Sequence, residues 1–142
     1  TASIPAHDWA NFSNYIPVFH ERIKGVVIEN RSAFDVLSTH DAEQTLHYVD
    51  PPYLFSTRSD RVKKAKSYRH ELTDEQHHEL ATVLHGLQGM VILSGYPSQM
   101  YTDLYPDWQC ITKPTHADRG LDRIECLWLN PAATRSQMRL NL

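Results

Sequence analysis

Several features that mark other protein classes are scarce in this chain of 142 residues. Its two cysteines, Cys110 and Cys126, form no CxxC pair and are too few for a disulfide framework, so we expect a reduced, cytoplasmic setting. The longest apolar runs, such as Met90 to Leu93, fall far short of the ~20 residues that a membrane span needs. No basic stretch followed by an apolar run opens the chain, which argues against a secretory signal. The chain begins at Thr1 and not at Met, which suggests processing, trimming or a fragment.

Glycine is scarce as well, and no two of its five copies lie within two residues of each other. A glycine-rich loop that holds a nucleotide or cofactor is therefore absent from this sequence. The nine histidines suggest a metal site, but His77-His78-Glu79 lacks the second histidine of an HExxH helix. No cysteine and histidine cluster has zinc spacing, so no metal is expected.

Charge is unevenly distributed along the chain. The formal net charge is −3, yet the stretch from Leu54 to His70 carries six cations and the single anion Asp60. The six cations are Arg58, Arg61, Lys63, Lys64, Lys66 and Arg69. A solvated, mobile loop is one interpretation, and a segment that contacts nucleic-acid phosphates is the other.

Hydrophobic patterns predict strands and helices that alternate within a single domain, residues 1–142. Strands are expected at residues 26–28, 45–49, 90–93, 108–113 and 124–129, and helices at 17–25, 32–37, 73–89 and 98–105. The last two strands suggest a hairpin with a long polar connection. This order predicts an α/β fold with an open, mostly parallel sheet and a C-terminal antiparallel β-hairpin. Ligands bind at the carboxyl ends of the strands in such sheets.

The tetrapeptide Asp50-Pro51-Pro52-Tyr53 directly follows one of these predicted strands. Two prolines fix φ near −65° and offer no N–H, so the segment leaves the strand as a stiff, extended loop. Such a loop holds the Asp50 carboxylate, the Pro51 carbonyl and the Tyr53 ring in a fixed relation. Two neighbouring acceptors match an exocyclic amino group, and the aromatic face can stack on a planar base. A simple turn is the alternative interpretation.

The stretch from Tyr48 to Leu54 resembles the catalytic motif of the Dam-type (D12 class) DNA adenine-N6 methyltransferases. Further segments of the chain are similar to this family in order and with compatible spacing: Gly25 to Asn30, Tyr68 to Thr73, Val91 to Tyr96 and Glu125 to Pro131. The resemblance covers roughly residues 9 to 133 and is greatest to phage and prophage members. It implies a partial Rossmann-like, S-adenosylmethionine-dependent methyltransferase sheet.

By this resemblance, Asp50 and the Pro51 carbonyl accept hydrogen bonds from the adenine N6 amino group, and Pro52 completes the motif. Tyr53 would stack on the adenine after it is flipped from the duplex. Asp50 and Phe34 would contact S-adenosylmethionine, although Phe34 fits equally well as a core residue. The basic stretch would contact the DNA backbone near the flipped nucleotide.

The family also has a glycine-rich cofactor segment and a target-recognition region, which this sequence lacks. We therefore expect the C-terminal half of such an enzyme, and its recognition sequence cannot be inferred. A second chain that supplies the cofactor half would complete it. The alternatives are methylation of a protein glutamine or an RNA base, or a catalytically incomplete module that binds DNA or a partner. Asp50 favours adenine in DNA, because the related enzymes more often carry Asn at that position.

Overall fold

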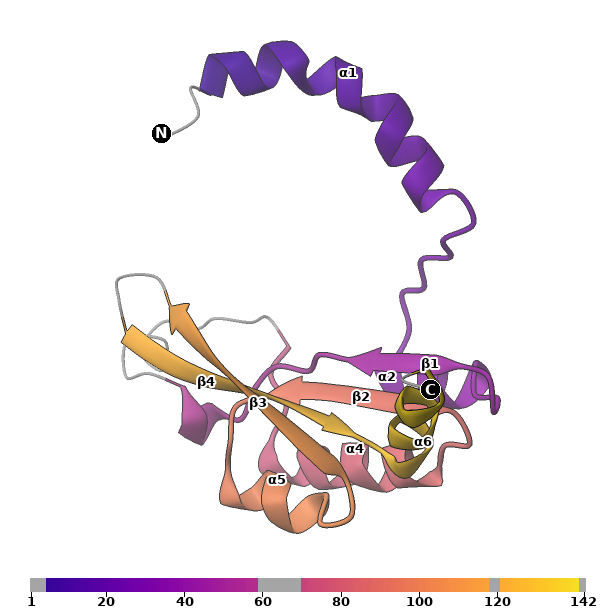
Figure 1. Ribbon diagram of the computed structural model, residues 1–142, viewed down its shortest axis with the longest axis vertical. Coiled ribbons are helices and arrows are strands. Elements are labelled where there is room, and N and C mark those ends of the chain that lie inside the picture. The colour runs from indigo at the N-terminus through magenta and orange to yellow at the C-terminus, as the bar shows by residue number, and fades with distance from the viewer. Residues whose placement is uncertain (1–4, 59–69, 118–120, 141–142) are drawn as a thin grey trace. The chain divides into compact units, whose positions relative to one another are not determined.

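The computed structural model describes residues 5–58, 70–117 and 121–140 of the chain. Its contacts divide the chain into two compact units, Thr1–Asn30 and Arg31–Leu142. The first unit holds one helix, and the second holds a sheet with its helices (Figure 1). The candidate site lies entirely in the second unit.

Helix α1, Pro5–Ile23, begins well before the helix that the sequence predicts, and Pro17 lies inside it instead of in its first turn. The polar and aromatic residues from His7 to Asn14 are therefore helical. Large apolar side chains recur along α1 with alternating steps of three and four residues, a helical spacing, and they are exposed: Trp9, Phe12, Ile16, Phe19 and Ile23. Gly25 has a φ of +86°, which fits its predicted place just after a helix end.

The strand predicted at residues 26–28 is not formed, and that prediction is wrong for this structure. Val26, Val27 and Ile28 lie in irregular, exposed backbone, with Ile28 91% exposed. The β-branched composition indicated a buried strand, but a strand also needs a neighbour for its backbone hydrogen bonds. Within the described residues, no strand pairs with this segment.

Four strands make one sheet in the order β1-β2-β4-β3. Strands β1, Leu46–Val49, and β2, Met90–Gly95, run parallel. Strands β3, Gln109–Ala117, and β4, Leu121–Leu129, form the predicted hairpin, and β4 also pairs antiparallel with β2. The α/β class and the hairpin are confirmed, but the sheet is mixed and not mostly parallel. Because the strand at 26–28 is missing, one parallel pair remains among the described strands.

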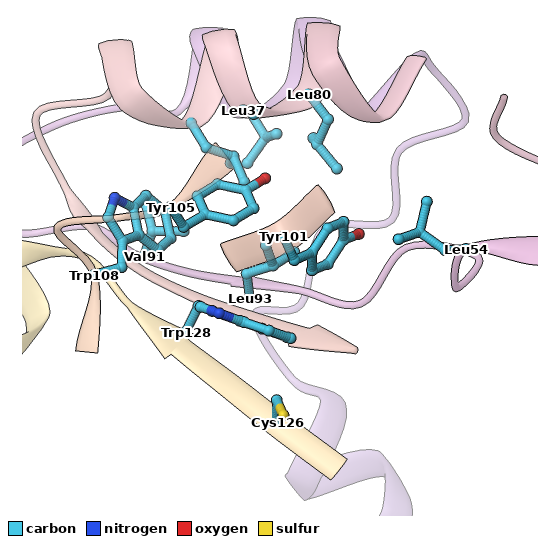
Figure 2. Close-up of a cluster of buried hydrophobic side chains, with 12 residues drawn as sticks. Leu37, Leu54, Leu80, Val91, Leu93, Tyr101, Tyr105, Trp108, Cys126 and Trp128 are labelled. Carbon is cyan, nitrogen blue, oxygen red and sulfur yellow. The ribbon is translucent and has the colours of Figure 1, made fainter. Parts of the chain in front are cut away.

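The core lies on one face of the sheet. Three helices contribute side chains to it: α2 (Ala33–Thr39), α4 (Asp74–Gly86) and α5 (Gln99–Leu104). Figure 1 shows α4 and α5 along the same side of the sheet. Figure 2 shows the aromatic rings of this core side by side with aliphatic side chains. The core residues are Leu37, Leu54, Leu80, Ala81, Leu84, Val91, Leu93, Tyr101, Tyr105, Trp108, Cys126 and Trp128.

Helix caps are formed where the sequence predicts them. Thr73 and Gln76 make a reciprocal capping box at the start of α4, and the Ser98 hydroxyl accepts a hydrogen bond from the Tyr101 amide at the start of α5. A further helix, α6, Pro131–Leu140, was not predicted. Its cap is Asn130, whose side chain accepts a hydrogen bond from the Ala133 amide at 2.9 Å. None of the helices in the described ranges is both long and apolar enough to cross a membrane.

Side chains from outside the sheet align the starts of β1 and β2. The Asp41 carboxylate accepts hydrogen bonds from the Gln88 amide at 2.8 Å and the Gly89 amide at 3.0 Å. Both bonds lower the pKa of Asp41 below its ordinary value of 3.8, and the bond from Gln88 has the larger effect. The Met90 amide then donates to the Thr45 carbonyl at 2.8 Å, which sets the register of the parallel pair. The opposite, carboxyl ends of the two strands are thereby brought level.

Candidate active site

The carboxyl ends of β1 and β2 place two polar side chains in contact. Asp50 directly follows β1, and Ser94 follows Leu93, which is the register partner of Val49. The Ser94 hydroxyl donates a hydrogen bond to Oδ1 of Asp50 at 2.6 Å. Ser94 is buried, at 5% exposed, whereas Asp50 is exposed. A buried hydroxyl thus holds one oxygen of a carboxylate that a ligand can reach from solvent.

The loop after Asp50 is anchored at its far end. Pro51, Pro52 and Tyr53 are half-buried, and Leu54 is 3% exposed within the core. The chain then turns through the 3₁₀ helix η1, Phe55–Thr57, where the Thr57 amide and hydroxyl both donate to the Leu54 carbonyl, at 3.0 and 2.8 Å. Both prolines lie within this loop, and the buried leucine fixes where it ends.

Tyr53 lies over this pair with its ring against a second tyrosine. The Tyr53 and Tyr96 ring centroids are 4.7 Å apart and the planes meet at 79°, an edge-to-face contact. Burial raises the pKa of Tyr53 above its ordinary value of 10.0, and a hydrogen bond with Ser94 acts in the opposite direction. The charge of Asp50, a hydrogen bond with Asp50 and the charge of Glu125 raise the pKa further. The phenol therefore stays protonated at neutral pH and serves as a hydrogen-bond donor, not as a base.

Arg58 is buried, whereas a cation that contacts DNA is expected on the surface. Its side chain is 5% exposed and donates to both carboxylate oxygens of Glu71, Nη1 to Oε1 at 2.9 Å and Nη2 to Oε2 at 2.7 Å. Nε also donates to the Tyr53 carbonyl at 2.8 Å, and Nη2 contacts the same oxygen. The guanidinium is occupied inside the protein, so the position of Arg58 does not fit the phosphate contact that its place in a basic stretch suggested.

The structure brings together only part of the predicted site. The four motif residues form one loop, and Phe34 is half-buried on α2, where it packs against the core. This position fits the core role that was the alternative for Phe34. The remaining predicted DNA contacts, Arg61, Lys63, Lys64, Lys66 and Arg69, lie outside the described residues.

Three residues at the site were not predicted to act there: Ser94, Tyr96 and Glu71. The sequence pointed only to the segments that contain them, Tyr68 to Thr73 and Val91 to Tyr96, and predicted no role for these three residues. The sequence alone did not show which of these side chains face Asp50 and Tyr53, because 44 residues separate Ser94 from Asp50.

The arrangement suits recognition of a planar amine. An exposed carboxylate held by the Ser94 hydroxyl, followed by a proline carbonyl, offers acceptors to an amino group with two N–H donors. An aromatic ring beside them offers a stacking surface. Of the two residues expected to contact S-adenosylmethionine, exposed Asp50 fits that role, whereas Phe34 contributes to the core.

A hollow in the described surface lies away from this site. It has a volume of about 380 Å³ and is lined by residues that include Trp108 and Pro131. These residues lie near the open end of the β3–β4 hairpin, where Gln109 and Leu129 pair beside the start of β2. Asp50 and Ser94 lie at the opposite, carboxyl ends of β1 and β2. The candidate site is therefore an open surface at the strand ends and not this hollow.

Comparison of the chain with models of known protein families finds no match, and none is found among curated proteins either.

Proposed function

We propose that this chain carries the catalytic part of a cytoplasmic DNA methyltransferase that transfers a methyl group from S-adenosylmethionine to N6 of adenine. The single observation that supports this most is the bond between Ser94 and Asp50, which fixes an exposed carboxylate at the carboxyl ends of two parallel strands. In open α/β sheets, this edge is where ligands bind. The motif that resembles adenine-N6 methyltransferases lies there.

In this proposal, the exposed Asp50 carboxylate and the Pro51 carbonyl accept hydrogen bonds from the N6 amino group. These bonds draw N6 toward tetrahedral geometry and localise its lone pair for attack. Ser94 keeps the carboxylate in place, because its hydroxyl holds Oδ1 at 2.6 Å. Tyr53 stacks on the adenine extruded from the duplex, and stacking contributes about 1–3 kcal/mol per base.

S-adenosylmethionine supplies the methyl group in this chemistry. Of the two residues expected to contact it, Asp50 and Phe34, Asp50 is the exposed one. The described loop orients adenine and excludes water from one side of it, and no glycine-rich cofactor loop is present in the sequence. The proposed partner is DNA, with a second chain that completes the cofactor site.

The test is single-turnover methyl transfer from labelled S-adenosylmethionine to duplex DNA by this chain together with the second chain that completes the cofactor site, with N6-methyladenine identified in the digested product. Asp50→Ala is expected to lower the rate by roughly 10²–10³-fold, as for loss of one preorganised polar group in other enzymes. DNA affinity is expected to persist, because phosphate contacts dominate it. Methylation by Asp50→Ala at the parent rate would refute the assignment. DNA binding with no transfer by the protein completed with its second chain would instead favour the module without chemistry.

The contribution of the basic stretch is tested separately. Changing Lys63, Lys64 and Lys66 to alanine is expected to weaken DNA binding equally for all sequences and to reduce its salt dependence by a slope of up to about three. Alanine at exposed Lys24 and Lys113 is the control. An unchanged slope would show that the three lysines do not contact phosphates.

A further inference from the structure

Next to the candidate site, the buried Arg58 forms an ion pair with Glu71, whose side chain is 39% exposed. The guanidinium contacts both carboxylate oxygens of Glu71 in a bidentate arrangement, a strong and directional form of charge-assisted hydrogen bond. It also binds the Tyr53 carbonyl through Nε and Nη2. Arg58 thus joins the backbone of the motif loop to Glu71, which lies 13 positions after Arg58 along the chain.

This geometry acts on the motif through its backbone. The Tyr53 carbonyl belongs to the peptide that joins Tyr53 to Leu54, and the Leu54 side chain is anchored in the core. Fixing that carbonyl fixes the plane of the peptide that follows Tyr53, which restricts the movement of the backbone that carries the Tyr53 ring. At the other end of the loop, Ser94 holds Asp50. The loop is therefore fixed at both ends by buried side chains.

We propose that Arg58 and Glu71 are a positioning pair that orients the Asp50–Tyr53 loop for adenine, a role that rests on the proposed function. Neither residue touches the base: Arg58 acts on the Tyr53 carbonyl, and Glu71 holds Arg58. A planar guanidinium with a fixed fork of donors is suited to this, because it binds the carboxylate and the carbonyl at once. Lysine keeps the charge but has no such fork.

Two conservative variants test the pair. Arg58→Lys keeps the charge and removes the fork, and Glu71→Gln keeps the shape and removes the charge. The matched controls are Arg22→Lys on exposed α1 and Glu79→Gln on the exposed face of α4. All proteins are studied well below their thermal midpoints, which are measured so that the comparison involves folded protein.

The first measurement isolates contact with the base. Fluorescence anisotropy gives the affinity for a single-stranded oligothymidine that contains one adenine, and for the same strand with an abasic site at that position. Phosphate contacts are common to both strands, so the affinity ratio reports the adenine. A stacked base corresponds to a ratio of about 5- to 150-fold. We expect Arg58→Lys and Glu71→Gln to lower this ratio at least about fivefold and to leave the abasic affinity unchanged.

The second measurement follows the loop itself by amide hydrogen exchange. The Thr57 and Arg58 amides donate to carbonyls of the turn, at 3.0 and 3.3 Å, and report its order. Both variants are expected to accelerate their exchange about tenfold, with the controls unchanged. A pair that only stabilises the fold would lower the thermal midpoint and leave the adenine ratio of folded protein as it was.

The outcomes separate the two proposals. Unchanged adenine ratios in both variants would overturn the positioning role and leave the proposed function intact. A parent ratio of one would overturn adenine recognition and with it the proposed function. In that case, amide hydrogen exchange tests whether the pair orients the loop. Faster exchange in the variants would support this role, and unchanged exchange would overturn it.

Discussion

Replacing Asn130 by alanine is expected to remove three buried hydrogen bonds at once. Its carbonyl oxygen accepts from the Val91 amide at 3.0 Å and from the Ala133 amide at 2.9 Å, and its amide group donates to the Gly89 carbonyl at 2.9 Å. Val91 is fully buried, and Asn130 is 6% exposed. The side chain therefore joins the start of β2 to the end of β4 and caps α6.

The magnitude follows from what the variant leaves unpaired. A buried polar group without a partner costs about 1–3 kcal/mol. Water reaches the Ala133 amide most easily, because it lies in the first turn of a helix. The Val91 amide and the Gly89 carbonyl would each lose a partner in a buried position. Adding the cost of these two groups, we expect the free energy of unfolding to fall by about 3 kcal/mol. This is a large part of the roughly 5–15 kcal/mol that stabilises an ordinary domain.

Urea unfolding at 25 °C, followed by tryptophan fluorescence, measures this loss. Trp108 and Trp128 are buried in the same unit and report its unfolding. The midpoint should fall with an unchanged slope, since the native surface stays the same. Asn14→Ala on exposed α1 is the control and should change stability by less than about 0.5 kcal/mol. A loss below about 1 kcal/mol for Asn130→Ala would refute the reasoning.

Three other changes have defined outcomes. Gly89→Ala would place a Cβ 2.7 Å from a backbone carbonyl and should destabilise the protein by about 1–3 kcal/mol in urea unfolding, whereas Gly86→Ala meets no atom within 4 Å and should not. Burial lowers the pKa of His77 below its ordinary value of 6.5, so the unfolded chain binds a proton first as the pH falls. Stability should therefore be full well above pH 6.5 and fall below it, and the fall should be less steep in His77→Leu. Tyr53→Phe should keep most of the adenine affinity ratio and Tyr53→Ala should lose it; equal losses would show that the hydroxyl, not the ring, contributes.

The elements that could be predicted from the sequence are those with local signals. The box of Thr73 and Gln76 and the cap at Ser98 involve groups within three residues of each other, and both form. Helix α6 carried a comparable signal, an asparagine followed by a proline at the first helical position, but no helix was predicted there.

Predictions that depend on distant neighbours succeeded less well. The strand expected at residues 26–28 has the right composition, but its formation depends on a paired strand that composition does not report. Arg58 belongs to a basic stretch by sequence, and only the fold shows that its side chain is buried against Glu71. At the site, the order of the four motif residues was evident, while their contact with Ser94 depends on the register of β1 and β2.

The pairing of β1 with β2 has a consequence for how the protein folds. Contacts between residues far apart in sequence form slowly, because a long loop must close before they stabilise the chain. The β3–β4 hairpin closes between Ala117 and Leu121, whereas Asp50 and Ser94 must meet across 44 residues. We therefore expect the hairpin to form early and the candidate site to assemble among the last events of folding. A nascent or damaged chain could then hold most of its sheet before it holds its proposed chemistry.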